Sequence, residues 1–280
     1  MLKAGIFLDI ENLSRNGGWG IRYDVVKNLV AAQGAVVLRA NVYMAIDEDR
    51  ESREPVQYQK RRDYRDAIRR NGYHMVLKSL RRYVNAEGET VVKANSDLDL
   101  AIDALLQADN LDYILLGSGD GDFIRVVRAL QNRGKRVDLL SFGNTSTDLR
   151  HEVDNHFSGF LVPGILPGDE TVPHRTRGVM ISCNVEKGFG FVSVRTGLGL
   201  NDVRNDVFMH IVDFSRDGRS VSNEQFANLK ARGAIIEFDM VEAGENRVKA
   251  MNAREFRWDD KLAAAAAVAA AANGGTAPTA

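Results

Sequence analysis

The chain has 280 residues, of which 37 are basic and 38 acidic, and this net charge of −1 by itself argues against a nucleic-acid partner. Its length corresponds to about two domains. A content of 44% hydrophobic and 27% charged residues is typical of globular proteins and argues against global disorder. The sequence has no uncharged apolar run of about 18 residues and no signal peptide, so we expect a cytoplasmic protein without a membrane-spanning helix. The single cysteine, Cys183, excludes an internal disulfide and a cysteine-based zinc site.

Composition divides the chain into four parts. Three of the five prolines lie within residues 163–173, in a stretch without apolar periodicity, which predicts a linker. The last residues are almost all alanine, with no second face to bury, and we expect them to be disordered. The expected parts are two domains, 1–160 and 177–258, a proline-rich linker, 161–176, and an alanine-rich tail, 259–280.

Strands and helices alternate in the first of these domains. In chain order the expected elements cover residues 6–8, 23–32, 36–44, 55–70, 73–78, 98–106, 113–116, 123–130 and 137–140. In the helix at 98–106, one apolar stripe is formed by Leu98, Ile102, Leu105 and Leu106. The alternation predicts an α/β fold with a mainly parallel sheet and helices on both faces. Ligands of such folds bind at the carboxyl ends of the strands.

The second domain is rich in short β-runs separated by turn residues. These runs cover residues 178–183, 189–194, 207–211, 235–241 and 248–253. Five short strands in a segment of this size predict a small five-stranded β-barrel of the oligonucleotide-binding (OB) type.

Carboxylates collect where the α/β fold places its ligands. Asp9 ends the first strand and is followed by Glu11 and Asn12, whereas Asp120 and Asp122 follow the most apolar strand. Three further acids, at positions 97, 99 and 103, open the helix before that strand. Residues 94–124 contain seven acids and no lysine or arginine.

Clustered carboxylates repel one another, and a divalent cation relieves that repulsion. Oxygen ligands of this kind suit Mg²⁺ or Mn²⁺, which could polarise a phosphodiester and activate water. Asn12 or Ser118 could hold a water or a phosphate oxygen without adding charge. Taken one at a time, Asp97 and Asp122 are also explained as helix caps, and Asp103, Asp109 and Asp112 as solvated surface charges. Asp9 is harder to explain in this way, because a lone carboxylate that ends an apolar strand needs a partner.

Four motifs carry a resemblance to a known family: Phe7-Leu-Asp9-x-x-Asn12, Lys93-x-x-Ser-Asp97-x-Asp99-x-x-x-Asp103, Gly117-Ser118-Gly119-Asp120-Gly121-Asp122-Phe123 and Leu130-x-x-x-Gly134-Lys135-x-Val137. As an ordered series over residues 1–160 they resemble the NYN domain, a branch of the PIN-like nuclease superfamily, and within it the LabA-like group. The resemblance implies a three-layer α/β/α fold and a metal-dependent ribonuclease site. By position, the family's metal-binding acids correspond to Asp9, Asp97, Asp120 and Asp122, and its asparagine to Asn12. Further candidates beside them are Asp99, Asp103 and Ser118.

A basic stretch balances the acidic one. Residues 50–82 carry a net charge of +7 and residues 94–124 a net charge of −7, so the near-zero total conceals a strong polarisation. A positive track of this kind suits a phosphate backbone. The candidate RNA contacts on the helix at 55–70 are Arg61, Arg62, Arg65 and Arg69. The alternative is a solvated helix with intrahelical ion pairs.

Two aromatic motifs in the second domain, Lys187-Gly-Phe189-Gly-Phe191 and Asp206-Val-Phe208-Met-His210, resemble those of a cold-shock domain. The resemblance covers about residues 177–255 and implies that single-stranded bases stack on Phe189, Phe191, Phe208 and His210, with Lys187 on a phosphate. The sequence departs from the family at Ser182-Cys183, where an aromatic pair is missing. The alternative is a barrel whose aromatic residues pack against a partner domain.

Together these features favour a divalent-metal-dependent ribonuclease that captures single-stranded RNA on the barrel and hydrolyses it at the acidic site. The alternative is a non-catalytic RNA-binding regulatory protein that retains a PIN-like fold. A phosphatase or another phosphoryl-transfer enzyme of α/β type is less favoured. It would use an aspartyl nucleophile with a partner acid two residues on, and here that position is a glutamate, Glu11, followed by Asn12. The choice between RNA and DNA, and between a monomer and a homodimer, stays open.

Overall fold

The computed structural model describes residues 1–84, 90–93, 96–167, 175–244 and 246–258. The chain forms two compact units. The first unit is Met1–Gly159 with Gly164–Pro167, and the second is Phe160–Pro163 with Gly168–Ala280. The expected tail and residues 168–174 of the expected linker lie outside the described residues. Within the described part, no helix is long and apolar enough to cross a membrane.

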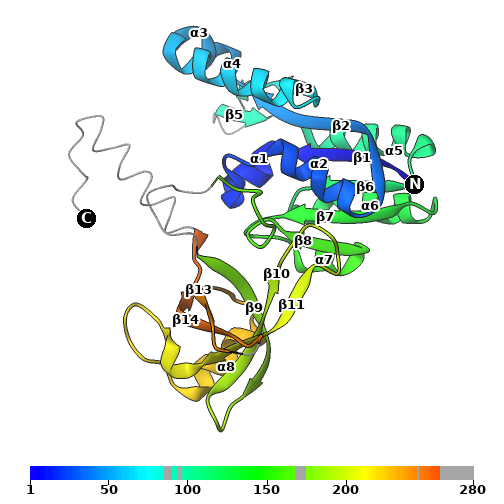
Figure 1. The fold of residues 1–280 in the computed structure, drawn as a ribbon. Helices are drawn as coiled ribbons and strands as arrows, with labels where there is room; N and C mark the ends of the chain where they lie inside the picture. The colour runs from blue at the N-terminus through cyan, green and yellow to red at the C-terminus, as the bar shows by residue number, and fades with distance from the viewer. Residues whose placement is uncertain (85–89, 94–95, 168–174, 245, 259–280) are drawn as a thin grey trace. The chain divides into compact units, whose positions relative to one another are not determined.

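The first unit is built on a six-stranded, fully parallel sheet with the order β3-β2-β1-β6-β7-β8 (Figure 1). Its strands are β1 (Leu2–Asp9), β2 (Ala35–Ile46), β3 (His74–Ser79), β6 (Tyr113–Gly117), β7 (Arg136–Ser141) and β8 (Asn155–Ser158). From β1 the chain continues outward to β2 and β3, and it then returns to build β6, β7 and β8 on the other side of β1. The boundary between β1 and β6 is therefore the point where the strand order reverses, which is where parallel sheets bind ligands.

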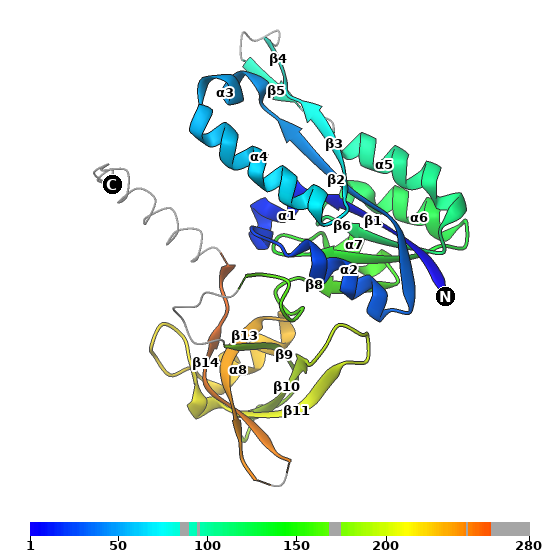
Figure 2. The same ribbon diagram turned by 45° about the horizontal axis from the view of Figure 1, so that its top comes forward.

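Helices cover both faces of this sheet, as Figure 2 shows for α5 and α6 on one face and α2 on the other. The helices are α1 (Ile10–Leu13), α2 (Tyr23–Ala32), α3 (Glu48–Arg53), α4 (Pro55–Arg70), α5 (Ser96–Gln107), α6 (Ile124–Gln131) and α7 (Thr147–Glu152). Successive residues of β1 point to opposite faces. Phe7 thus packs in one core cluster with Leu100 of α5 and Val127 of α6, whereas the side chains of Leu8 and Leu13 both lie close to Gly117. The predicted three-layer α/β fold is confirmed.

The helix predicted at 98–106 is confirmed, but its buried face differs from the apolar stripe of the sequence. Leu100 and Ala104 pack against the sheet, whereas Leu98, Ile102 and Leu106 are exposed. Both sets have helical spacing, so periodicity alone could not choose between them.

Several short elements had no sequence signal. They are the hairpin of β4 (Arg81–Val84) and β5 (Thr90–Lys93), helix α7 and strand β8. Each has four to six residues, which is too short for a clear apolar period. Strand β8 matters for the site, because it carries His156 beside β7.

The second unit contains a closed five-stranded barrel in the order β11-β10-β9-β13-β14, with β14 pairing back onto β11 in parallel (Figure 1). The strands are β9 (Thr176–Asn184), β10 (Phe189–Arg195), β11 (Val203–His210), β13 (Ile235–Glu242) and β14 (Val248–Glu255). The two-residue strand β12 (Phe214–Ser215) and helix α8 (Asn223–Ala231) lie between β11 and β13 in the chain. Alternate residues such as Val192, Val207 and Met209 fill the interior together with Phe226 of α8. This barrel is consistent with the predicted OB type, whereas α8 was not predicted.

Candidate active site at the carboxyl edge of the sheet

Asp9 is a buried carboxylate at the end of β1, with 5% of its surface exposed. Its Oδ1 accepts a hydrogen bond from the backbone N–H of Asn12 at 3.1 Å and so caps α1, and its Oδ2 accepts one from Ser118 Oγ at 3.3 Å. Burial, together with the charges of Asp97 and Glu11, raises the pKa of Asp9 to about 6 against the opposing effect of the two hydrogen bonds. The charged form of Asp9 is therefore costly unless a cation is near.

The loop after β6 lies directly beside Asp9, because β1 and β6 are paired in parallel with Leu8 opposite Gly117. The backbone N–H of Gly119 donates to Asn12 Oδ1 at 2.7 Å, which ties this loop to α1. Asp120 Oδ1 accepts from the backbone N–H of Asp122 at 3.0 Å and caps the short turn at 121–123. The structure thus has caps at Asp9 and Asp120, whereas the sequence suggested caps at Asp97 and Asp122. A cap does not exclude a chemical role.

Asp97 completes the cluster from the first turn of α5. Its pKa is raised by partial burial and then by the negative charges of Asp120, Glu11 and Asp122. These electrostatic contacts place the four predicted acids around one region, together with Asn12 and Ser118. Glu11 is a further member that we did not single out from the sequence, although it lies only two residues after Asp9. Its carboxylate accepts from the backbone N–H of Ala45 at 3.1 Å and pairs with Arg15 at 2.9 Å.

Asp99 and Asp103, the two additional candidates on α5, contact neighbouring strands instead. Asp99 forms an ion pair with Lys78 of β3 at 2.8 Å. Asp103 Oδ2 accepts a hydrogen bond from the hydroxyl of Tyr43 in β2 at 2.8 Å. Both side chains therefore help to fix α5 on the sheet.

The donor set of the cluster fits a hard divalent cation in its chemistry, because all of its ligating atoms are carboxylate, amide or hydroxyl oxygens. Burial and then neighbouring carboxylates raise the pKa values of Asp9 and Asp97, so a cation bound between them would favour their charged forms. As the side chains lie, no three His, Cys, Asp or Glu residues in the described part of the chain form a group that could hold a metal ion.

The loop at 142–146 is hydrogen-bonded both to the loop after β6 and to the segment that follows α1. The backbone N–H of Ser146 donates to the carbonyl of Gly119 at 2.9 Å, and Asn144 Nδ2 donates to Asn16 Oδ1 at 3.1 Å. A Cβ at Gly119 would lie 3.2 Å from the backbone of Thr145, so glycine permits this close approach.

Behind the loop at 142–146, Thr145 Oγ1 donates to the buried Ser141 Oγ, which lies 2.7 Å from Nε2 of His156. Burial, and then the charge of Arg150, lowers the pKa of His156 to about 4. The imidazole is therefore neutral at physiological pH, and its tautomer determines whether His156 Nε2 or Ser141 Oγ donates this hydrogen bond. No local sequence signal linked these residues, because they meet only when β8 pairs with β7.

Comparison with known proteins identifies the family. The family model described as the NYN domain matches residues 3–161, which is more than half of the chain. The chain belongs to the NYN domain family. It is 27% identical over 161 residues to the low amplitude and bright protein LabA of Synechococcus elongatus, covering 55% of this chain and 82% of LabA. A solved structure of a protein of unknown function from Vibrio parahaemolyticus is 27% identical, with a TM-score of 0.44, over 56% of this chain and 92% of that one.

The predicted basic track of the NYN domain lies on α4, where its arginines have unequal surroundings. Arg65 is only 11% exposed and pairs with Glu51, so it holds α3 against α4. Arg61 lies 3.7 Å from Glu54, and Arg69 pairs with Asp66 at 2.8 Å. Arg62 is exposed and forms no ion pair with another described residue. Of the four arginines, Arg62 is thus the one best placed to meet a phosphate, and Arg65 the one least able to.

The predicted RNA-binding residues of the barrel form one outward-facing aromatic patch on β10 and β11, made of Phe189, Phe191, Phe208 and His210. The antiparallel register pairs Phe189 with His210 and Phe191 with Phe208. The rings of Phe189 and Phe208 stack with centroids 5.6 Å apart, and Phe208 and His210 stack at 6.5 Å. All four side chains are partly exposed, whereas the residues between them point into the barrel.

Two neighbouring strands border this aromatic patch. On β14, the ammonium of Lys249 lies 5.8 Å from the ring centroid of Phe208. On β9, Ser182 is exposed opposite Phe191, so one of the two positions that lack an aromatic residue lies beside the patch. Cys183 instead packs against the barrel core, and burial raises the pKa of its thiol. Lys187 is exposed in the turn before β10.

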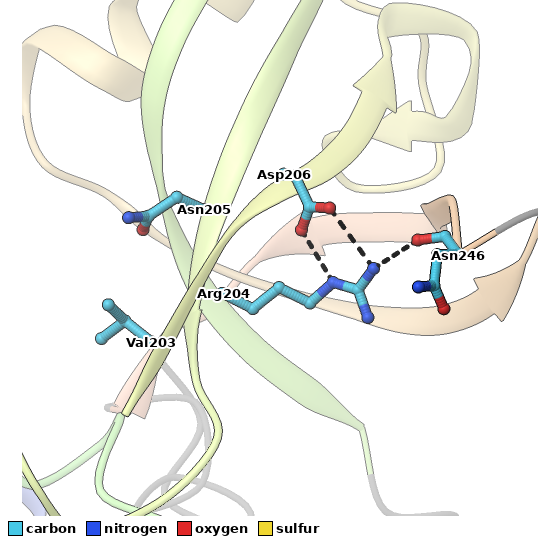
Figure 3. A pocket seen from close by; sticks show the side chains of 5 residues that line it. All are labelled: Val203, Arg204, Asn205, Asp206 and Asn246. Atoms are coloured by element: carbon cyan, nitrogen blue, oxygen red, sulfur yellow. Dashed lines mark hydrogen bonds and ion pairs between the residues drawn. The ribbon is translucent and has the colours of Figure 1, made fainter. Parts of the chain in front are cut away.

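An open hollow lies on β11, lined by Val203, Arg204, Asn205, Asp206 and Asn246 (Figure 3). Arg204 donates to Asp206 Oδ1 at 2.7 Å and to the backbone carbonyl of Asn246 at 2.7 Å. Its guanidinium is therefore already neutralised by a carboxylate. We assign this hollow no role in RNA binding.

Proposed function

We propose that this protein is a divalent-metal-dependent ribonuclease that captures single-stranded RNA on its barrel and hydrolyses phosphodiester bonds in its NYN domain. NYN domains are PIN-like, nuclease-type domains, so a nuclease-like or RNA-related role follows from the family. The observation that carries the proposal is the gathering of Asp9, Asp97, Asp120 and Asp122 at the β1–β6 boundary. Four carboxylates of like charge repel one another, and burying them in one place lowers the stability of a fold. Such an arrangement therefore indicates a chemical role.

The four carboxylates would hold Mg²⁺ or Mn²⁺, which lowers the pKa of a bound water and stabilises negative charge on the scissile phosphate. Asn12 has a separate, orienting task. Because its Oδ1 accepts from Gly119 N–H, its amide nitrogen is left to donate to a phosphate oxygen or to the attacking water. Ser118 fixes the second oxygen of Asp9 and so sets the direction in which that carboxylate points.

Substrate capture would use the aromatic patch. Each base stacked on such a ring contributes roughly 1–3 kcal/mol with little sequence preference. Lys187 and Lys249 would contact phosphates beside the rings, and Arg62 would do so on the NYN domain. Because these groups would bind unpaired bases and phosphates, a single-stranded substrate needs no unwinding before it binds.

The second candidate function is a non-catalytic RNA-binding regulator. It is favoured by the aromatic patch, which binds bases without any contribution from the carboxylates. In this case RNA binding persists when the acidic cluster is neutralised, and no RNA is cleaved under any metal condition.

The deciding experiment measures cleavage of several single-stranded RNAs by purified protein with Mg²⁺ or Mn²⁺. The wild type is compared with an Asp9→Asn/Asp120→Asn double variant. Asp109→Asn serves as a matched control, because the side chain of Asp109 is 81% exposed and its carboxylate lies 3.8 Å from Arg133. The proposal requires that the double variant lose cleavage while the control retains it. If the wild type cuts no faster than the double variant, the enzyme proposal fails and the regulator remains.

A further inference from the structure

Trp19 is a large exposed side chain that the proposed chemistry does not use. It follows the irregular turn at Ser14–Gly18, and 72% of its surface is exposed. An indole ring exposed to this extent gains little for the fold, whereas aromatic side chains dominate the energetics of binding surfaces.

The backbone around Trp19 is held firmly. Gly18 packs against the ring of Phe142, where a Cβ would come within 2.6 Å of that ring. The N–H of Ile21 donates to the carbonyl of Gly18 at 3.3 Å, and the N–H of Arg22 donates to the carbonyl of Ile165 at 2.8 Å. The indole therefore projects from a fixed loop.

One face of the indole is supported by Tyr64 of α4. The two rings are nearly parallel, with an interplanar angle of 21° and centroids 6.3 Å apart. The hydroxyl of Tyr64 lies 2.7 Å from that of Tyr23, which is 5% exposed and packs edge-on against Tyr73 at 5.2 Å. Trp19 thus extends a chain of aromatic rings anchored in the core, and its remaining surface is open.

The position of Trp19 connects the two charged regions of the NYN domain. On one side, its loop continues from α1, and Asn16 Nδ2 donates to the carbonyl of Asn12 at 2.7 Å. On the other side, Lys60 and Arg61 lie one helical turn before Tyr64, on the same side of α4. Trp19 is therefore joined on one side to the loop that carries Asn12 and on the other side to the basic helix α4.

We propose that Trp19, supported by Tyr64, is a stacking platform for one unpaired nucleobase of the substrate strand. Phosphates on either side of this base contact the cations of α4, Lys60 and Arg61. The ligand class rests on the proposed function, because a strand with accessible bases is the substrate inferred for the carboxylate cluster. The platform would hold the strand in register close to the site of cleavage, separately from capture by the barrel.

The test uses the full chain with Trp258→Phe, which leaves Trp19 as the sole tryptophan. A single-stranded RNA decamer is titrated in metal-free buffer with EDTA, and tryptophan fluorescence and affinity are measured. A decamer with abasic residues is the matched ligand. We expect base-dependent quenching of Trp19, and about tenfold weaker binding by Trp19→Ala for the normal decamer only. The control is Val56→Ala, which removes an exposed apolar side chain on α4, and it should bind RNA as the wild type does.

Unchanged affinity of Trp19→Ala together with unquenched fluorescence overturns the platform. So does equal quenching by the abasic decamer, or a change of oligomeric state in Trp19→Ala, which would assign the indole to a protein interface. Failure of the platform and failure of the ribonuclease proposal remain distinguishable. Quenching of Trp19 should persist in the Asp9→Asn/Asp120→Asn background, where cleavage is lost, and in Phe189→Ala/Phe208→Ala, where the barrel no longer captures bases.

Discussion

The carboxylate cluster of the NYN domain and the aromatic patch of the barrel hold their side chains in opposite ways. Asp9 is almost fully buried, accepts two hydrogen bonds and has a raised pKa. Phe189 and Phe208 stand on the outside of the barrel and support one another by stacking. The first arrangement opposes folding, because a buried charge is expensive. The second gains free energy from ring contacts even without a ligand.

This difference indicates a division of labour. Costly, fixed charges are useful where a reaction needs exact geometry, whereas partly exposed rings suit binding that tolerates many sequences. Substitutions in the cluster should therefore affect turnover sharply and improve stability. Substitutions in the patch should affect affinity in proportion to the stacking area that they remove.

The largest effect is expected from Asp97→Asn. Removing one of the acids that interact electrostatically with Asp120 should lower the cleavage rate on the order of a thousandfold with RNA affinity nearly unchanged. The matched control is Asp99→Asn, two residues further on, whose carboxylate pairs with Lys78. Single-turnover cleavage assays with Mn²⁺ check this. Equal losses in the two variants would show that charge on α5, and not the position of Asp97, matters.

A smaller, graded effect is expected from Phe189→Ala/Phe208→Ala. Losing two stacked rings should weaken binding of single-stranded RNA by about a hundredfold, at roughly tenfold for each base. Anisotropy of a labelled RNA measures it, and circular dichroism verifies the fold. Val212→Ala, which removes an exposed side chain outside the patch, is the control. If RNA binding survives the double substitution, the residues that capture RNA lie outside the barrel.

The third effect is on stability. Since the pKa of Asp9 is about 6 in the folded protein against an ordinary 3.8, the folded state binds its proton more tightly than the unfolded state does. The contribution of Asp9 to the free energy of unfolding is thus fully present below pH 3.8 and is lost as the pH rises through 6. In metal-free buffer, Asp9→Asn should be about 3 kcal/mol more stable than the wild type at pH 8.

That stability difference should shrink towards zero at pH 4, because the wild-type carboxyl is then protonated. Urea unfolding at both pH values measures it, with Asp109→Asn as the control that should follow the wild type. A variant less stable than the wild type at pH 8 would mean that the carboxylate's hydrogen bonds to Asn12 and Ser118 outweigh the cost of its burial.

The sequence predicted most of the framework, because long apolar runs and strong periods determine it. The helix at Pro55–Arg70 matches its prediction residue for residue. Hydrophobic periodicity failed to predict the buried face of α5, because two sets of its apolar residues have helical spacing. It also failed to predict β8, because this strand is too short to show a period. The acids of the candidate site were predicted as a set, and the structure brings Asp9, Asp97 and Asp120 into one electrostatic cluster. The individual partners of Asp99, Asp103 and Arg65 depend on tertiary neighbours that no local spacing encodes.

The smallest effect tests the gap beside the aromatic patch. Ser182 is exposed opposite Phe191, at the position where the cold-shock family has an aromatic residue. Ser182→Trp should add one stacking surface and tighten binding of single-stranded RNA about fivefold, close to the lower limit for one stacked base. Ser220→Trp, in an exposed loop, controls for a non-specific gain from tryptophan. Because the gain requires the new ring to join existing ones, it should disappear in the Phe189→Ala/Phe208→Ala background. A gain that persists there would mean that the added indole binds RNA by itself and that the four rings of the patch do not act as one surface.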